Sequence, residues 1–294
     1  MTPETGTAPE GDHAMELILL GTGGGPQPNL ERSAPAQVLV HHGRLIVVDA
    51  GNGVARQITR AGLALRDLSM VLLTHHHIDH TADYGNLVLL SWTAGLVNPV
   101  RVYGPPPLTQ ITTDYVAMTA VDVAHREALG RPKLSELFDV REIEAAGAVH
   151  DADGLRITAA LAEHPPMSPA FGFRFDAGDR SVVISGDTAA AEPVIELAAG
   201  ADVLVHEAYS PEHLHLLWRG HNADLEKMRA HFARAHTTAE DAGRVAARAG
   251  VRTLVLSHLI PTTGICPEQF RQQAARHFGG NLVVGTDLHR ISIY

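Results

Sequence analysis

The sequence predicts an α/β fold in which two β-sheets pack face to face between outer layers of helices, a four-layer αββα sandwich. Three observations support this prediction. Apolar runs with strand character recur along the chain, segments with helical spacing lie between them, and no stretch rich in Pro, Gly or Ser divides the 294 residues. We therefore expect one domain over residues 15–294.

The N-terminal region is expected to pass from a tail into β-structure. Residues 1–14 are polar, contain Pro and Gly, and lack the basic start and apolar core of a signal peptide, which predicts a disordered tail. Residues 15–29 begin as a short apolar strand that glycines interrupt. Residues 36–51 contain two β-type runs joined at His42 and Gly43, which predicts a hairpin.

The rest of the chain mixes strand-like and helical segments. Residues 53–62 place Val54, Ile58 and Ala61 on one helical face and end in a glycine. A second clear helix is expected from residue 238 to residue 250, which is also a glycine. The other apolar runs predict strands at residues 69–75, 100–105, 155–164, 171–176, 180–187, 201–208 and 253–261.

Composition narrows the class of protein. The formal net charge is -10, from 23 Lys and Arg against 33 Asp and Glu, and no basic run stands out. This argues against a protein that mainly binds nucleic acid phosphates, although a net acidic chain could still hide a local basic patch. The single cysteine, Cys266, excludes an intrachain disulfide and is typical of a reducing compartment. No apolar stretch reaches the ~18 to 20 residues of a membrane span. A cytoplasmic location is therefore expected, without a membrane partner.

A glycine-rich segment, GTGGGP at residues 21–26, invites comparison with phosphate-binding loops. Such loops lead directly into a helix whose N-terminus faces the phosphate. Here Pro26 and Pro28 follow, and the next expected element is a strand. We interpret the segment as a tight turn that needs positive φ and that can still border a pocket.

Six apolar strands finish in residue types that bind metals. The same ends of neighbouring strands meet in space, and open sheets place their sites there. In HHHIDH at residues 75–80, a turn can direct His75 and His77 at one metal ion and Asp79 with His80 at a second, and a carboxylate can bridge two cations. The alternative, buried histidines with ordinary hydrogen-bond partners, explains one such ending better than six. The residues are Asp49, His75 to His80, His164, Asp187, His206, Glu207 and His258.

With these motifs the chain resembles the metallo-β-lactamase fold superfamily, in particular its ribonuclease Z-like and arylsulfatase-like hydrolases. VVDAG, HHHIDH, EHPP, SGDT and LSHL occur in the family's order, and the resemblance spans residues 15–294. It implies two zinc ions, with Mn and Fe left open, and a supporting role for Asp49 behind the ligands. The implied ligands are His75, His77 and His164 for one ion, Asp79, His80 and His258 for the other, and Asp187 between them.

Two further stretches resemble the ribonuclease Z-like branch. VHEAY is similar to its H-E-A-T motif and AHTTAED to its H-S-T loop, so the resemblance implies that Glu207 and His236 cooperate near the scissile group. Asp79 is a further catalytic candidate, as an acceptor of a proton from the nucleophile. Alternatively, Glu207 and His236 only cap local structure. Tyr209 stands where the family has threonine.

Departures from the ribonuclease Z pattern favour a small substrate. The 23 positions from His164 to Asp187 leave no room for the long arm that grips tRNA, and Arg32 alone suggests the family's basic N-terminal segment. Residues 208–235 are longer than expected, so they could roof the metal ions and form a pocket with Trp218, His213, His215 and His221, or these side chains could only pack or face solvent.

We therefore predict a dinuclear zinc hydrolase in which a hydroxide held between the two ions attacks a small ester, with aryl sulfate or a carboxylic ester or lactone as the leading substrates. Nucleic acid is not expected as a partner. The alternatives are a phosphodiesterase of the ribonuclease Z type that processes tRNA 3′ ends, and a metal-binding protein without turnover.

Association is a separate expectation. Residues 83–96, DYGNLVLLSWTAGL, are too apolar for an exposed helix, and related enzymes often dimerise through this region. A homodimer is therefore expected. The alternative is a helix that packs into the core of its own chain.

Overall fold

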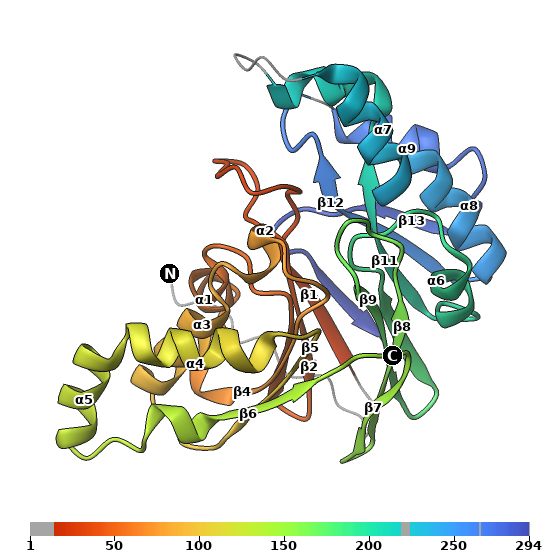
Figure 1. Ribbon diagram of the computed structural model, residues 1–294. Coiled ribbons are helices and arrows are strands. Elements are labelled where there is room, and N and C mark those ends of the chain that lie inside the picture. Colours follow the sequence, from red (N-terminus) through yellow and green to blue (C-terminus); the bar gives the residue numbers. More distant parts are fainter. Residues whose placement is uncertain (1–14, 219–223, 265, 294) are drawn as a thin grey trace, which may run out of the picture.

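The computed structural model describes residues 15–218, 224–264 and 266–293, and it confirms the four-layer sandwich (Figure 1). Two seven-stranded sheets stack at the centre, in the orders β14-β1-β2-β3-β4-β5-β6 and β13-β12-β11-β10-β9-β8-β7. The expected tail at residues 1–14 lies outside the described residues. The last strand pairs with the first, and we retain a single domain over residues 15–294 as a proposal.

The first sheet is antiparallel at one edge and parallel from β3 to β6. His42 (φ 49°) and Gly43 (φ 72°) both have positive φ in the β2–β3 turn, the conformation of a two-residue hairpin. The expected hairpin is therefore present. The strands of this sheet are β1 Met15–Gly21, β2 Ala36–His41, β3 Arg44–Val48, β4 Leu68–Leu72, β5 Val100–Gly104, β6 Phe138–Glu142 and β14 Arg290–Ile293.

The second sheet is parallel from β10 to β13 and continues through antiparallel pairs to β7. The strands predicted along the second half of the sequence lie here. They are β7 Gly147–Ala152, β8 Leu155–Leu161, β9 Phe171–Ala177, β10 Arg180–Ile184, β11 Val203–Tyr209, β12 Thr253–Ile260 and β13 Asn281–Val284.

Helices cover the outer face of each sheet, α1 and α3 to α5 on one side and α6, α8 and α9 on the other (Figure 1). The predicted helix in the last third is α8: Thr238 accepts a hydrogen bond from the Asp241 amide (3.0 Å), and Gly250 ends the helix at φ 66°. The helices are α1 Val54–Arg60, α2 Ile78–Thr81, α3 Tyr84–Thr93, α4 Leu108–Met118, α5 Ala120–Ala128, α6 Glu192–Leu197, α7 Leu225–Ala235, α8 Ala239–Ala249 and α9 Pro267–Ala274, with 3₁₀ turns η1 Leu65–Asp67, η2 Leu134–Leu137 and η3 Pro211–Trp218.

The strand directions bring the polar strand ends together. β3 and β4 of one sheet and β8, β10, β11 and β12 of the other finish at the same end of the sandwich, where α2 also lies (Figure 1). The apolar core between the sheets ends below these loops. No helix in the described part of the chain has the length and apolarity needed to cross a bilayer.

The apolar stretch at residues 83–96 forms α3 and the turn after it. Tyr84, Leu87, Trp92 and Leu96 are buried in the chain's own core, which accounts for much of the apolar character of this stretch. The indole Nε1 of Trp92 donates to the carbonyl of Pro132 (3.0 Å). The expected homodimer is not needed to bury these side chains, and it stays a prediction.

Replacement of Trp92 tests the packing of α3. We expect Trp92→Ala to lower the free energy of unfolding by about 3–5 kcal/mol, because it leaves a cavity in a fully buried site. The exposed Leu30→Ala is the control and leaves stability unchanged. Denaturant unfolding gives both values. If Trp92→Ala keeps its stability but changes from a dimer to a monomer in solution, Trp92 lies in a subunit contact instead.

Candidate dinuclear metal site

Ring nitrogens of three histidines, from two loops, lie close together and face one another. Nε2 of His75 lies 2.9 Å from Nδ1 of His77, which lies 3.0 Å from Nε2 of His164. His75 follows β4, His77 precedes α2, and His164 follows β8 of the other sheet. Nitrogens that bind one zinc ion in a tetrahedral arrangement are about 3.3 Å apart. The three rings therefore have nearly the spacing of a metal-binding triad.

A second group stands beside the first. Nε2 of His80 lies 3.3 Å from Nε2 of His258 and 3.6 Å from Oδ2 of Asp79, and the same carboxylate oxygen is 3.5 Å from His258. Asp79 and His80 belong to α2, whereas His258 belongs to β12. The two sheets together therefore build this group as well.

Asp187 lies between the two groups. Its Oδ2 is 3.9 Å from His75 and 3.8 Å from His164, and its Oδ1 is 3.3 Å from both His80 and His258. Oδ1 is also buried without a hydrogen-bond donor among the described residues. A buried carboxylate oxygen without a donor is costly unless a cation binds it. All seven ligand candidates from the sequence thus meet in two adjoining groups. One holds His75, His77, His164 and Asp187, and the other holds Asp79, His80 and His258; Asp187 also forms a third possible group with His236 and His258. These donor sets indicate a dinuclear metal site.

Partners behind the rings orient them. Asp49 accepts from the ring Nδ1 of His80 (2.8 Å) and from the amide of Thr74 (2.8 Å), and the Thr74 hydroxyl lies 3.0 Å from Nδ1 of His75. Nδ1 of His164 lies 2.7 Å from the carbonyl oxygen of Ala235, so it is the ring nitrogen that carries the proton. These contacts leave Nε2 of each of the three rings for the metal clusters.

The backbone approaches the site closely at two glycines. A Cβ on Gly24 would lie 2.8 Å from Nδ1 of His258, and Gly186 has φ 61° with a would-be Cβ 2.7 Å from the carbonyl of Phe171. The next amide of the glycine-rich loop, that of Gly25, donates to Oδ2 of Asp79 (3.0 Å). The loop at residues 21–26 is therefore a turn, as interpreted, and it borders the metal site.

Charge in the buried site favours cations. Burial lowers the pKa of the imidazoles in the first cluster, that of His77 to about 4, so they are neutral and able to bind a metal. Burial also lowers the pKa of His80 and His258, but carboxylates, Asp187 foremost, outweigh it and raise both. Positive charge is therefore stabilised between these carboxylates.

Glu207 and His236 form a buried pair at the edge of the metal site. Nδ1 of His236 lies 2.9 Å from Oε2 of Glu207, and Oε1 accepts from the amide of Thr188 (2.6 Å). Burial raises the pKa of Glu207 and lowers that of His236 to about 4, which favours the uncharged forms. Nδ1 of His236 lies 3.9 Å from Oδ2 of Asp187, so the pair adjoins the candidate metal ligands, and its part in catalysis stays a prediction.

The segment 208–235 packs beside the site. Its η3 and α7 elements contact β11 and β12 through a small core of Tyr209, Leu214, Met228, Phe232 and Ile260. Tyr209 thus fills an apolar position where the family has threonine. Nδ1 of His213 lies 2.9 Å from the hydroxyl of Ser210, before η3, and Nδ1 of His215 lies 3.0 Å from the carbonyl oxygen of Glu212. His221 lies outside the described residues. The segment supports the site through Ala235 and His236, at the end of α7.

Two sequence expectations about single residues change. His206 alternates with Glu207 along β11, and its Nδ1 lies 2.9 Å from its neighbour's carbonyl oxygen, so His206 is outside both metal clusters. Arg32 serves structure, because its Nη1 donates to the hydroxyl of Thr22 and the carbonyl of Gly285 (both 2.7 Å). Sequence reasoning missed Thr74 and Thr188, although each stands next to a ligand.

The comparisons place this geometry in a family. The model of the beta-lactamase superfamily domain matches residues 44–259. A ribonuclease Z of Mycobacterium sp. (strain KMS) is 35% identical over 95% of this chain and 96% of its own length. A ribonuclease Z of Mycobacterium bovis (strain BCG / Pasteur 1173P2) is 33% identical over 95% and 99%. The chain belongs to the ribonuclease Z branch of the metallo-β-lactamase superfamily.

Solved structures agree on the fold. A metallo-beta-lactamase fold protein of Bacillus subtilis has a TM-score of 0.71 at 20% identity, over 95% of this chain and 99% of that one. The short form of human tRNase Z has a TM-score of 0.70 at 22% identity, also over 95% and 99%. Family membership and the dinuclear site make this chain a metal-dependent hydrolase.

The expectation of a small-ester substrate, with nucleic acid excluded as a partner, is wrong. Relatives named ribonuclease Z match the chain from end to end, which favours the phosphodiesterase alternative. The absence of a long tRNA-binding arm was a poor criterion for the substrate. The relatives named ribonuclease Z align with this chain over 96–99% of their own length, so they too leave little room for a large additional arm. The arylsulfatase-like branch gains no support from these relatives.

Metal content tests the site. We expect two divalent ions per chain by elemental analysis, and about one in His77→Ala, because one cluster loses a ligand. The matched control is His76→Ala: the neighbouring ring lies 2.7 Å from the carbonyl of Pro105 and outside the clusters, so both ions should stay. Fewer than two ions in the parent protein, without uptake of added zinc, would contradict the dinuclear site.

Proposed function

We propose that this protein is an endoribonuclease of the ribonuclease Z type, which hydrolyses a phosphodiester bond at the 3′ end of precursor tRNA. The observation that carries the proposal is the match along 95% of the chain to curated ribonuclease Z proteins at 33–35% identity. The dinuclear metal site supports it, because two-metal sites suit the in-line displacement of phosphodiester hydrolysis.

We propose zinc as the metal, since histidine nitrogens form most of the donor set. When bound, the two ions would lower the pKa of a water molecule and neutralise charge on the phosphoryl group. The residues proposed to hold them are His75, His77 and His164 for one ion, Asp79, His80 and His258 for the other, and Asp187 for both.

The chain's own residues supply orientation and proton transfer. Glu207 holds Nδ1 of His236, so Nε2 is the ring nitrogen that can face the substrate. With Glu207 protonated and donating to Nδ1, Nε2 carries the ring proton and would stabilise negative charge on the departing oxygen or give that proton to it, while Nδ1 takes the proton of Glu207. Asp79, held by the amide of Gly25, would accept a proton from the attacking nucleophile.

The substrate is proposed to approach the metal ligands from the solvent side. The cavity lined by Asp49, His80, Asp187, Glu207 and His258 measures ≈ 20 Å³, the space of about one water molecule. His77 is only half-buried, so a phosphodiester on an RNA surface can reach the cluster from the solvent side.

Cleavage of a precursor tRNA transcript with a 3′ trailer tests the proposal. We expect the metal-loaded protein to cut the trailer endonucleolytically, and a chelator to abolish the cut. Aryl sulfate and carboxylic ester substrates serve as controls and should turn over at least ~10²-fold more slowly. Turnover of either ester without RNA cleavage would reject the proposal, and no turnover of any substrate would support a metal-binding protein without catalysis.

Two histidine variants separate catalysis from metal binding. His236→Ala should keep two metal ions and the fold but lower the rate of RNA cleavage ~10²-fold or more, because it removes a positioned proton donor. His258→Ala should lose metal, because it removes a ligand of the second cluster. Metal content and rate are measured on both. Full activity of His236→Ala would leave it as the cap of α7, and loss of metal would make it a ligand.

A further inference from the structure

A pocket of ≈ 360 Å³ lies between the loop at residues 26–34 and helix α1. Three arginines line it, Arg32, Arg56 and Arg60, together with amides such as Gln27 and Asn29. Its lining, within the described residues, contains no Asp or Glu. Asp287 lies behind this wall, where it accepts from Gln57 (3.2 Å) and from the amide of Ser33 (2.7 Å) and offsets the charge of Arg32. In a chain with a net charge of -10, Arg56 and Arg60 therefore supply most of the positive charge of the pocket.

Arg56 and Arg60 differ from most other cations of the protein. Most lysines and arginines in the described ranges form ion pairs, as Arg248 does with Glu192 (2.7 Å). Arg56 and Arg60 form none there: Arg60 only donates to the amide oxygen of Gln57 (2.8 Å), which orients it without neutralising it. Both side chains are exposed and lie four residues apart on α1, so they share one face.

The walls of the pocket are tied to the metal ligands. The loop begins at Gly25, whose amide bonds to Asp79. The segment that leads into α1 is held by α2 and by the start of α3, because the amide of Ala50 donates to the carbonyl of His80 (2.7 Å) and that of Gly53 to Asp83 (2.6 Å). A group bound in the pocket is therefore positioned relative to the metal site.

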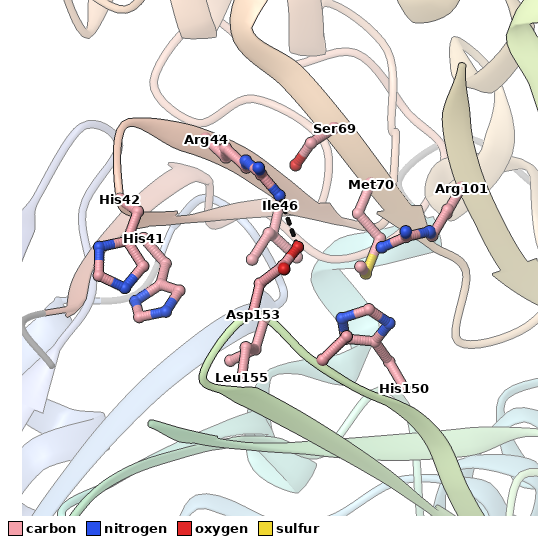
Figure 2. Close-up of a pocket in the computed structure, with 11 residues that line it drawn as sticks. His41, His42, Arg44, Ile46, Ser69, Met70, Arg101, His150, Asp153 and Leu155 are labelled. Carbon is pink, nitrogen blue, oxygen red and sulfur yellow. Dashed lines mark hydrogen bonds and ion pairs between the residues drawn. The ribbon is translucent and has the colours of Figure 1, made fainter. Parts of the chain in front are cut away.

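A second pocket that also contains arginines is less suitable for an anion, because it contains a carboxylate. It lies at the opposite end of the sheets, where Arg101 lies near His150 and Arg44 points to Asp153 (Figure 2). There Arg44 donates to Asp153 (2.8 Å), which places a carboxylate inside the pocket. An anion would have to displace or face this carboxylate, so the pocket beside α1 is the better phosphate site.

We propose that Arg56 and Arg60 bind backbone phosphates of the RNA substrate and hold it while the metal site cuts. This rests on the proposed function and explains how an acidic protein can bind RNA. Phosphate contacts position a nucleic acid without reading its sequence. Arg32 contributes charge to the pocket, but its hydrogen bonds belong to Thr22 and Gly285.

The test compares the double variant Arg56→Ala/Arg60→Ala with the parent on precursor tRNA. We expect KM to rise about tenfold or more, and the slope of log(kcat/KM) against log[salt] to become less steep by about 1–2, because two phosphate contacts are lost. Arg56→Lys/Arg60→Lys should keep most of the affinity, since charge is retained. Arg66→Ala, which removes an exposed arginine before β4, is the matched control with unchanged KM.

A small chromogenic phosphodiester separates binding from chemistry, since it has no RNA backbone and its turnover should stay unchanged in the double variant. An unchanged KM and salt slope on precursor tRNA would overturn the proposal for the pocket, as would an equal loss on the small substrate. Failure of the parent protein to cut precursor tRNA would reject the proposed function instead. If circular dichroism shows that the alanine variant folds poorly, Arg56→Lys/Arg60→Lys is compared with Arg56→Glu/Arg60→Glu instead. Equal KM values of these two variants on precursor tRNA would contradict a charge-based role.

Discussion

The structure depends on the convergence of buried imidazoles and carboxylates at one end of two packed sheets. Ring nitrogens of three histidines come within 3.0 Å of their neighbours, and Asp187 reaches both clusters. Buried polar groups at such distances are stable only with partners or a bound cation. The fold therefore has to supply rigid strands on both sides, and the six strands that finish here do so.

A second layer of contacts makes the cluster specific. Asp49, itself in a left-handed conformation (φ 60°), holds His80 and Thr74, and His258 has φ 46°. Non-glycine residues with positive φ cost about 1–3 kcal/mol each and persist where the surroundings fix them. Here hydrogen bonds and the glycine-rich loop surround the ligands, so stability is exchanged for a defined arrangement of donor atoms.

Net charge proved a weak guide to the substrate. The net charge of -10 includes many ion pairs whose charges cancel locally. An RNA molecule interacts instead with the charges on the surface that it contacts. Arg56 and Arg60 are separated by three residues in an ordinary helix, so they form no visible basic run. Their common exposure beside the metal site emerges only when α1 is placed against the loop at residues 26–34.

The sequence alone determined the features that depend on local chemistry. Apolar runs that finish in His, Asp or Glu predicted strands and candidate ligands, and Thr238 with Gly250 delimited α8. The family resemblance then selected seven of these residues as the ligand set. The tertiary structure decided what depends on contacts between distant segments. It turns Nδ1 of His77 and Nε2 of His75 toward the same metal cluster. It also places Nδ1 of His236 against the carboxylate of Glu207, and it holds Arg32 by a hydrogen bond to Thr22. Local patterns specify which side chains a strand presents, whereas the packing of two sheets sets which atoms meet.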